Sequence, residues 1–328
     1  MTGGPDGVAG EHAFIAGLRA LATHPAARGL SDDAAVLEIG ATRLVLTHDM
    51  LVEGVHFLPA DPPTDIAWKL LAVNLSDLAA KGARSLGVLM GYTLSDAAWD
   101  RAFAEGLAAA LAAFQVPLLG GDTVSAPAGA PRSFGLTAIG EAAGPVPSRS
   151  GAAPGDRLWT SGTIGDAGAG LRILQGRLRG PLSLVERYRR PAPRLEAGQA
   201  LAPLVSAMMD VSDGLLIDAG RMAQASGVAL TIDLSQIPLS ADFLEALGET
   251  RDARLAAATA GDDYELLFTA PASRSDEIRA LSAELALPLT PIGAAAAGSG
   301  LALTFENTAI PLPERLGWEH DSPAPLAS

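Results

Sequence analysis

The sequence contains no cysteine among its 328 residues. Disulfide bonds, thiol nucleophiles and thiolate-bound metal ions are therefore excluded for this chain. The absence also fits a reducing compartment, because disulfides form and persist in oxidising ones. We expect the protein to work in the cytoplasm.

Long apolar runs and excess positive charge are absent as well. The most apolar stretch, GLAAALAAFQVPLLGG, is interrupted by Gln115 and Pro117, whereas a membrane-spanning helix needs roughly 18 or more apolar residues. The first residues lack a basic segment followed by an apolar one, so we expect no signal peptide. The formal net charge of −14 disfavours nucleic-acid binding, which needs a basic surface. We expect neither a membrane nor a nucleic acid as a partner.

Lysine is scarce, with Lys69 and Lys81 as the two copies in the chain. The sequence has no GxxxxGK[ST] phosphate loop and no HRD or DFG kinase motif. Any bound phosphate must therefore be neutralised by Mg²⁺ and arginine. Arg149, in SRSGAAPGD, is the candidate, and a solvated linker residue is the alternative. The stretch GTIGDAGAG lacks the GxGxxG spacing, and it fits either a tight strand-to-helix turn or a phosphate contact.

The composition, with 48% hydrophobic and 18% charged residues, is typical of a globular protein. The length favours two domains of roughly 150 residues each. Both halves mix helical and strand-like segments, so we predict two α+β domains. Residues 144–156, rich in Gly, Pro and Ser, mark the boundary, which divides the chain into 1–148 and 149–328. We also expect helix N-caps at Thr64 and Ser212.

Aspartates recur where the predicted elements turn or end. Each has a simple structural explanation, because Asp favours turns and helix caps, and Asp77 is spaced to pair with Lys81 along a helix. The residues concerned are Asp32, Asp33, Asp49, Asp77, Asp122, Asp210, Asp213, Asp262 and Asp263.

Taken together, these acids predict a cation site. Asp77 lies in an apolar helix, Asp49 ends an apolar strand, and Asp122 follows a glycine turn at Gly120-Gly121. Two carboxylates about 4 Å apart repel each other by roughly 4 kcal/mol at an effective dielectric constant of about 20, so such a group needs cations or shifted pKa values. Oxygen ligands without cysteine suit Mg²⁺ or Ca²⁺ better than zinc. The sequence therefore predicts a site for a Mg²⁺-nucleotide complex.

Five segments in this order resemble the thiamine-monophosphate kinase family, within the superfamily of aminoimidazole ribonucleotide synthetase. They are DMLVEGVHF, AVNLSDLAAKGA, LGGDT, DVSDGL and GDDYELLFT. The resemblance runs from GEHAFI to GWEH and so covers nearly the whole chain. It implies that the protein phosphorylates thiamine monophosphate to thiamine diphosphate with ATP. It also implies several Mg²⁺ ions and a homodimer built through the N-terminal domains, whose sheets pair.

The resemblance also implies the residues of the site. The implied metal ligands are Asp33, Thr47, His48, Asp49, Asp77, Asp122, Asp210 and Asp213. The implied ATP contacts are Gly121, Asp122, Arg149 and Ser212. The implied contacts of the thiamine phosphate are His56, Asp262 and Trp318. Local sequence alone explains these last three as a loop histidine, a turn acid and a tryptophan that covers the C-terminal domain.

Two motifs depart from the family pattern. The family often has Ser-Asp or Thr-Asp where this chain has His48-Asp49. A metal ligand supplied by the backbone carbonyl of residue 48 does not depend on this change of side chain. The usual Gly-Asp-Asp is here Ser31-Asp32-Asp33, which keeps both acids.

Two other functions fit the same sequence features. A synthetase of the same superfamily has a different substrate, and a non-catalytic nucleotide-binding protein binds ATP without turnover. Selenophosphate synthetases and hydrogenase maturation factors use a cysteine that this chain lacks. For the kinase, the nucleophile is a phosphate oxygen that is largely ionised at pH 7, since the second pKa of a phosphate monoester is near ~6. We therefore expect direct in-line transfer with no catalytic side chain acting as a base.

Overall fold

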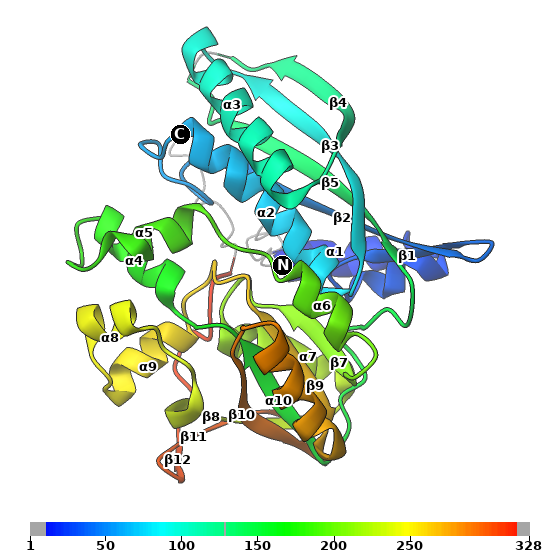
Figure 1. Ribbon diagram of the computed structural model, residues 1–328, viewed down its shortest axis with the longest axis vertical. Helices are drawn as coiled ribbons and strands as arrows, with labels where there is room; N and C mark the ends of the chain where they lie inside the picture. The colour runs from blue at the N-terminus through cyan, green and yellow to red at the C-terminus, as the bar shows by residue number, and fades with distance from the viewer. Residues whose placement is uncertain (1–10, 128, 320–328) are drawn as a thin grey trace, which may run out of the picture.

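The computed structural model describes residues 11–127 and 129–319, which form two sheets and the helices around them (Figure 1). The first sheet has the strand order β1-β2-β5-β3-β4, in which β3 and β4 are parallel and the other neighbours antiparallel. Its strands are β1 (Ala35–Ile39), β2 (Thr42–Val52), β3 (Arg84–Leu94), β4 (Leu118–Ser125) and β5 (Ser133–Ala142). The helical elements of this part are α1 (Glu11–Arg19), η1 (Pro25–Leu30), α2 (Pro63–Ala80) and α3 (Ala97–Phe114).

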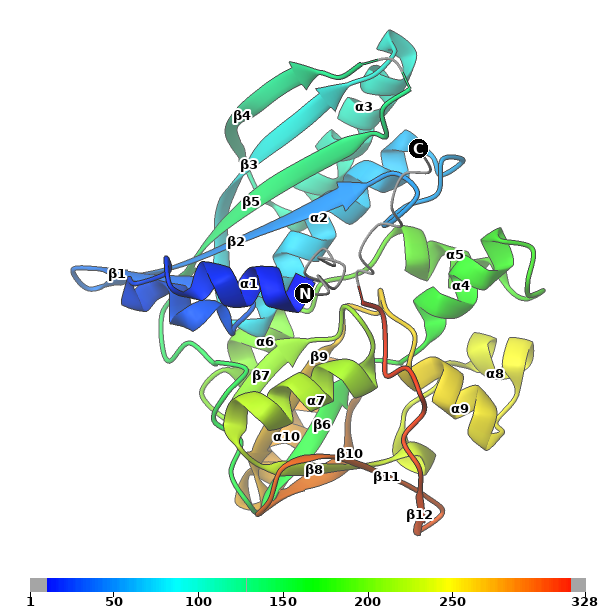
Figure 2. The same ribbon diagram turned by 180° about the vertical axis from the view of Figure 1, so that it is seen from behind.

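Helices α2 and α3 cover one face of this sheet (Figure 1). Helix α3 begins where the Asp96 side chain accepts hydrogen bonds from two N–H groups of the first turn, which is the usual N-cap arrangement. Its Phe103 packs on Phe134 of β5, with ring centroids 5.0 Å apart. The opposite face is turned toward the viewer in Figure 2. The apolar side chains of Met50, Leu89 and Leu119 are exposed there, whereas their strand neighbours Leu51 and Val88 are buried toward the helices.

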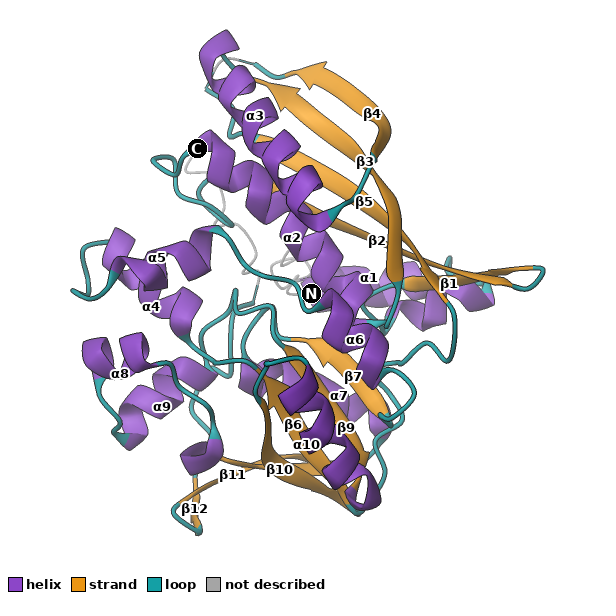
Figure 3. Cartoon of the chain, viewed as in Figure 1, coloured by secondary structure: helices purple, strands orange, loops and turns teal. Residues whose placement is uncertain are grey.

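The second sheet has the order β12-β11-β8-β10-β6-β9-β7. Its strands are β6 (Asp156–Ser161), β7 (Ala207–Asp210), β8 (Ala229–Asp233), β9 (Leu266–Pro271), β10 (Leu289–Ala296), β11 (Gly300–Phe305) and β12 (Thr308–Ile310). The helices are α4 (Asp166–Leu174), α5 (Leu182–Arg189), α6 (Leu195–Leu201), α7 (Leu215–Ser226), α8 (Ala241–Leu247), α9 (Arg251–Ala258) and α10 (Ser275–Glu284), with short η2 (Leu234–Gln236) and η3 (Ala272–Arg274). Helix α7 packs on one face, and α6 and α10 on the other (Figure 3).

Helix α2 joins the two halves. Nearly all of its residues are buried, which is typical of a helix that is covered on every side. Its last turns contact α6 and β7 of the second half. Gly198 of α6 approaches so closely that a Cβ there would lie 1.9 Å from the carbonyl oxygen of Ala79. The polar residues of α2 are therefore placed at the boundary between the two sheets.

Several expected element ends are wrong. Strand β2 continues to Val52, paired with β5 along this length, so Asp49 lies inside the strand rather than at its end. Helix α2 begins at Pro63, and no side chain caps it, so Thr64 is not its N-cap. The N-cap of α7 is Gly214, not Ser212.

The glycine turn expected at residues 120–121 is also wrong, because both glycines lie within β4. Among the described residues, no helix is long and apolar enough to cross a bilayer.

Candidate active site

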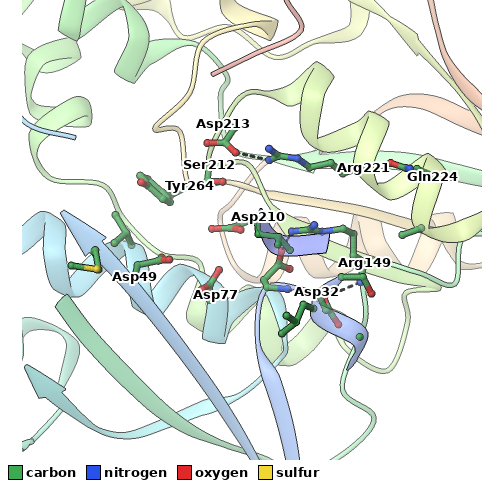
Figure 4. Close-up of a pocket in the computed structure, with 18 of the residues that line it drawn as sticks. Asp32, Asp49, Asp77, Arg149, Asp210, Ser212, Asp213, Arg221, Gln224 and Tyr264 are labelled. Carbon is green, nitrogen blue, oxygen red and sulfur yellow. Dashed lines mark hydrogen bonds and ion pairs between the residues drawn. The ribbon is translucent and has the colours of Figure 1, made fainter. Parts of the chain in front are cut away.

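A cavity of about 790 Å³ lies between the two halves of the molecule (Figure 4). Its wall combines residues of β2 and α2 with residues of the 149, 210–213 and 221–225 segments. The predicted site residues that line it are Asp33, Asp49, His56, Asp77, Arg149, Asp210, Ser212 and Asp213. The sequence segments that carry them are distant along the chain, and the boundary between the sheets brings them together.

Three carboxylates form the acidic part of the cavity: Asp77 and Asp210 are buried, and Asp49 is partly exposed. Burial, followed by the charges of Asp33 and Asp213, raises the pKa of Asp49 to about 6. Burial and the charge of Asp33 raise the pKa of Asp210 to about 8. Burial and the charges of Asp49 and Asp210 raise the pKa of Asp77 well above its usual range. The group therefore binds protons at neutral pH unless cations compensate its charge.

Hydroxyl and amide groups fix these acids in place. Thr47 donates to Asp77, and Ser76 donates to Asp210 at 2.5 Å. The side-chain oxygen of Asn74 accepts from the backbone N–H of Asp49 at 2.9 Å. Because Asn74, Ser76 and Asp77 all belong to α2, this helix orients the acidic part of the cavity.

A cationic group lies beside the acids. The Lys81 ammonium is buried and lies 2.5 Å from Asp32 and 2.7 Å from Asp33. Although burial alone raises it, the charges of Lys81 and Arg28 lower the pKa of Asp32 to about 2. Arg149 also pairs with Asp33 and is partly exposed. Arg149 therefore lies at the cavity wall, with its guanidinium group paired to a carboxylate.

Asp218 of α7 holds the loop between β7 and α7 through hydrogen bonds to its backbone. The Oδ2 atom of this buried side chain accepts from the N–H groups of Ser212, Asp213 and Gly214, at 3.1, 3.1 and 3.3 Å. Arg221 bridges Asp218 and Asp213, at 2.8 and 2.5 Å. Sequence reasoning missed Asp218. The signal for it was an acid on the apolar face of an amphipathic helix.

The three residues expected at the thiamine end lie near the loop of Gly261 to Tyr264. His56 lines the cavity, and its Nδ1 accepts from the N–H of Val52 at 3.0 Å. Asp262 pairs with Lys69 and accepts from the Tyr264 hydroxyl. The Trp318 side chain is half exposed, and the backbone N–H of this residue donates to the Asp213 carbonyl at 2.8 Å.

Two comparisons with known proteins decide the family. The family models for AIR synthase related proteins match residues 31–142 (N-terminal domain) and 153–306 (C-terminal domain). The thiamine-monophosphate kinase of Escherichia coli is 40% identical over 274 residues, which cover 81% of this chain and 83% of that protein. The enzyme of the same name from Caulobacter vibrioides is 39% identical over 305 residues, covering 90% and 86%.

This chain belongs to the thiamine-monophosphate kinase family. Solved structures agree. A structure described as AaThiL complexed with AMPPCP and TMP superposes with a TM-score of 0.82 at 30% identity and covers 95% of this chain and 97% of its own. The thiamine-monophosphate kinase of Stenotrophomonas maltophilia gives 0.75 at 41% identity, covering 89% and 94%. A hydrogenase maturation protein, HypE with ATP, gives 0.69 at 20% identity and shares the fold alone. The predicted family and α+β fold are confirmed.

Three residues expected at the metal and nucleotide sites of a thiamine-monophosphate kinase lie elsewhere in the single chain. The described lining of the cavity does not include Gly121 and Asp122, which lie on the exposed edge strand β4. His48 lies on the face of β2 away from α2, where its Nδ1 is 2.9 Å from the Thr137 hydroxyl. Among residues 11–127 and 129–319, no three or more His, Asp or Glu side chains are arranged as a group that could hold a metal ion.

The GTIGDAGAG segment forms a closed turn in this member of the thiamine-monophosphate kinase family. The N–H of Gly165 donates to the Asp263 carboxylate at 2.8 Å. A Cβ at Gly165 would lie 2.5 Å from that of Ala257. The glycines therefore allow close packing of α4 on α9, and this favours the first of the two sequence readings.

Proposed function

We propose that the protein transfers the terminal phosphoryl group of ATP to the phosphate of thiamine monophosphate, which yields ADP and thiamine diphosphate. The observation that carries this proposal is the cavity itself. It places an acidic group, an arginine and the thiamine-end histidine around one space. Membership of the thiamine-monophosphate kinase family supports the choice of reaction, as does the similar structure whose description names AMPPCP and TMP.

The chemistry of the oxygen donors in the cavity supports Mg²⁺ as the proposed cation. Burial and the charges of neighbouring aspartates raise the pKa values of Asp49, Asp77 and Asp210. Oxygen ligands are the ones that Mg²⁺ prefers. The proposed ligands of several ions are Asp33, Thr47, the backbone carbonyl of His48, Asp49, Asp77, Asp122, Asp210 and Asp213. When bound, Mg²⁺ screens the repulsion between the two polyanions and stabilises the ADP leaving group.

The nucleotide and the thiamine phosphate occupy opposite ends of the cavity in this proposal. Arg149 exchanges its contact with Asp33 for a phosphate oxygen, and Ser212, Gly121 and Asp122 complete the ATP contacts. At the other end, the neutral His56 ring carries its proton on Nε2, since Nδ1 accepts from Val52.

His56 can donate a hydrogen bond from Nε2 to the thiamine phosphate. The thiamine rings have two further proposed contacts. Asp262 accepts from the aminopyrimidine, and Trp318 stacks on the cationic thiazolium.

The transfer needs no catalytic base. The attacking phosphate oxygen is already largely ionised at pH 7, because its pKa is near ~6. The residues of the chain bind and align the two substrates and exclude water, and this positioning supplies the main catalytic effect. We therefore propose a single direct in-line step without a phosphorylated enzyme.

We also propose a homodimer through the open face of the first sheet. Met50 and Leu119 on this face are 51% and 56% exposed. Single exposed apolar residues are common, but several on one face of a sheet favour association with another chain. His48 and Asp122 lie on the first sheet but away from the cavity of their own chain, so a partner sheet would give them a role.

The proposed location is the cytoplasm, and we propose that neither a nucleic acid nor a membrane is a partner. The proposed boundary between the two domains lies between residues 148 and 149.

The test is the choice of acceptor. Purified protein with ATP and Mg²⁺ should release ADP when thiamine monophosphate is added. ADP release with a formylglycinamidine substrate instead would favour the synthetase reaction of the superfamily. ATP binding without ADP release under either condition would favour the non-catalytic alternative.

A further inference from the structure

Both lysines of the chain are buried where its two halves meet. Lys69 is 2% exposed and Lys81 is fully buried. Lysine is almost never fully buried unless it is paired, and a buried ammonium group needs partners for its three N–H donors. The contacts of each lysine therefore indicate what it does.

Lys69 links three groups from distant segments. Its Nζ atom lies 3.1 Å from Asp262 Oδ2 and donates to the backbone carbonyl of His56 at 3.1 Å. It also lies 3.9 Å from the centre of the Tyr188 ring, within cation–π distance. Lys69 belongs to α2, whereas Asp262 and Tyr188 belong to the second half of the chain. One ammonium group thus joins the two halves at the thiamine end of the cavity.

The Asp262 carboxylate is held by two side chains, while the backbone N–H of this residue donates to the Ser212 carbonyl at 2.8 Å. Its φ of 69° and that of Tyr264, 50°, are left-handed, and residues other than glycine keep this conformation only where their surroundings hold them. The Tyr264 hydroxyl donates to Asp262 Oδ1 at 3.2 Å, while Lys69 holds Oδ2. The carboxylate is therefore oriented through both oxygens, and 27% of the side chain remains exposed.

His56 is fixed by the same ammonium group. Lys69 binds its carbonyl oxygen, and the Val52 N–H binds its ring. The Tyr188 hydroxyl lies 3.4 Å from the same carbonyl. Two residues that we propose to contact thiamine monophosphate thus share a single anchor, although they come from different halves of the chain.

We infer that Lys69 is a positioning residue that sets the affinity for thiamine monophosphate by holding Asp262 and His56 in register across the domain boundary. This inference rests on the proposed function. Lys81 provides the matched comparison, because it is equally buried but contacts Asp32, Asp33 and the Met208 carbonyl. It therefore serves the metal and nucleotide end.

The test compares Lys69→Met with Lys81→Met in full-length protein. For Lys69→Met we expect the KM for thiamine monophosphate to rise at least about tenfold, which is the change expected when one charge-assisted hydrogen bond is lost. The KM for ATP should change less than about twofold. For Lys81→Met we expect instead a rise in the KM for ATP and in the Mg²⁺ concentration that gives half-maximal activity. Equal changes in both KM values for Lys69→Met, as a general loss of structure would give, overturn the inference.

A second pair of variants guards against misfolding of Lys69→Met. Lys69→Gln keeps a donor, and Asp262→Asn keeps the side-chain shape. Calorimetric titration with thiamine monophosphate, without ATP, should show weaker binding in each single variant and a loss in the double variant that is smaller than the sum of the two single losses. Additive losses mean that Lys69 does not act through Asp262 and overturn the inference. If the wild-type protein itself fails to bind thiamine monophosphate, the proposed function fails first and the inference falls with it.

Discussion

The Oδ2 atom of Asp218 accepts a hydrogen bond from the backbone N–H of Asp213 at 3.1 Å, so a buried residue of α7 holds the loop that carries a proposed metal ligand. Two neighbouring N–H groups bind the same oxygen. Such a loop would lose its shape without the carboxylate, because three backbone donors would then lie without an acceptor.

Replacing this carboxylate should therefore cost stability. We expect Asp218→Ala to lower the free energy of unfolding by roughly 1–3 kcal/mol, which is the range for leaving buried donors without an acceptor. Urea unfolding followed by circular dichroism measures it. Asp276→Ala is the control, because Asp276 is 97% exposed in its surface pair with Arg279, and such pairs contribute about 0–1 kcal/mol. Equal losses in the two variants would contradict the role of Asp218.

Stability without metal should depend on pH through the buried acids. The pKa of Asp49 is raised to about 6 and that of Asp210 to about 8, above the unfolded value of about 3.9. The folded state thus binds more protons, and the stability that these protons give is lost as the pH rises through the folded pKa values. In EDTA, we expect the melting temperature to fall between about pH 4 and pH 8, from the unfolded pKa to the higher of the two folded pKa values.

Two controls separate this effect from general charge repulsion. Asp210→Asn should flatten the pH dependence, because it removes one of the titrating groups. Mg²⁺ should raise the melting temperature most at the alkaline end. Asp32, with a pKa of about 2, acts with the opposite sign and only below about pH 4. A melting temperature that rises with pH in EDTA would contradict the raised pKa values.

Asp122 should be essential for turnover but not for folding. It lies on the exposed strand β4, so we expect Asp122→Asn to abolish activity and to change the free energy of unfolding by less than about 0.5 kcal/mol. Near-normal activity in this variant would contradict the proposed metal ligands. Product formation and thermal unfolding, measured on the same preparation, give both values.

The same residue tests the proposed dimer. If Asp122 completes the cavity of the partner chain, mixing Asp122→Asn with Asp210→Asn subunits should restore about a quarter of wild-type activity, because half of the dimers are mixed and each then has one complete site. If Asp122 serves its own chain, every site in the mixture carries one defect. A mixture as inactive as its parents would therefore contradict the shared site.

Trp318 should contribute affinity for the thiamine ring. Its side chain is half exposed, so Trp318→Ala should leave the fold intact and raise the KM for thiamine monophosphate about tenfold, as expected for loss of a stacked cationic ring. Trp318→Phe keeps an aromatic face and should recover part of the affinity. An unchanged KM in Trp318→Ala would leave this tryptophan as a cover of the C-terminal domain.

The acidic part of the site could be predicted from the sequence, because its residues sit at recognisable breaks in apolar segments. Asp33, Asp77 and Asp210 all line the cavity as expected. Their partners could not be predicted, since Lys81 and Ser76 meet them only through contacts between distant segments. The sequence reading offered Asp77 as the ion-pair partner of Lys81, whereas the structure places Lys81 against Asp32 and Asp33.

The element ends failed for physical reasons that a local pattern does not contain. Asp49 resembles a strand terminus, but β5 pairs with β2 as far as Val52 and extends the strand past it. Thr64 resembles an N-cap, but Pro63 already occupies the first helical position, which its fixed φ suits. Lys69 and Asp218 read as helix residues of no special role, because their function depends on neighbours that the fold supplies.

The most direct test of the central claim is a chromatographic assay of purified protein with ATP, Mg²⁺ and thiamine monophosphate, with EDTA as the control. We predict thiamine diphosphate and ADP in equal amounts, and neither product in EDTA. ADP without thiamine diphosphate, or thiamine diphosphate formed equally well in EDTA, would contradict metal-assisted phosphoryl transfer to thiamine monophosphate in this cavity.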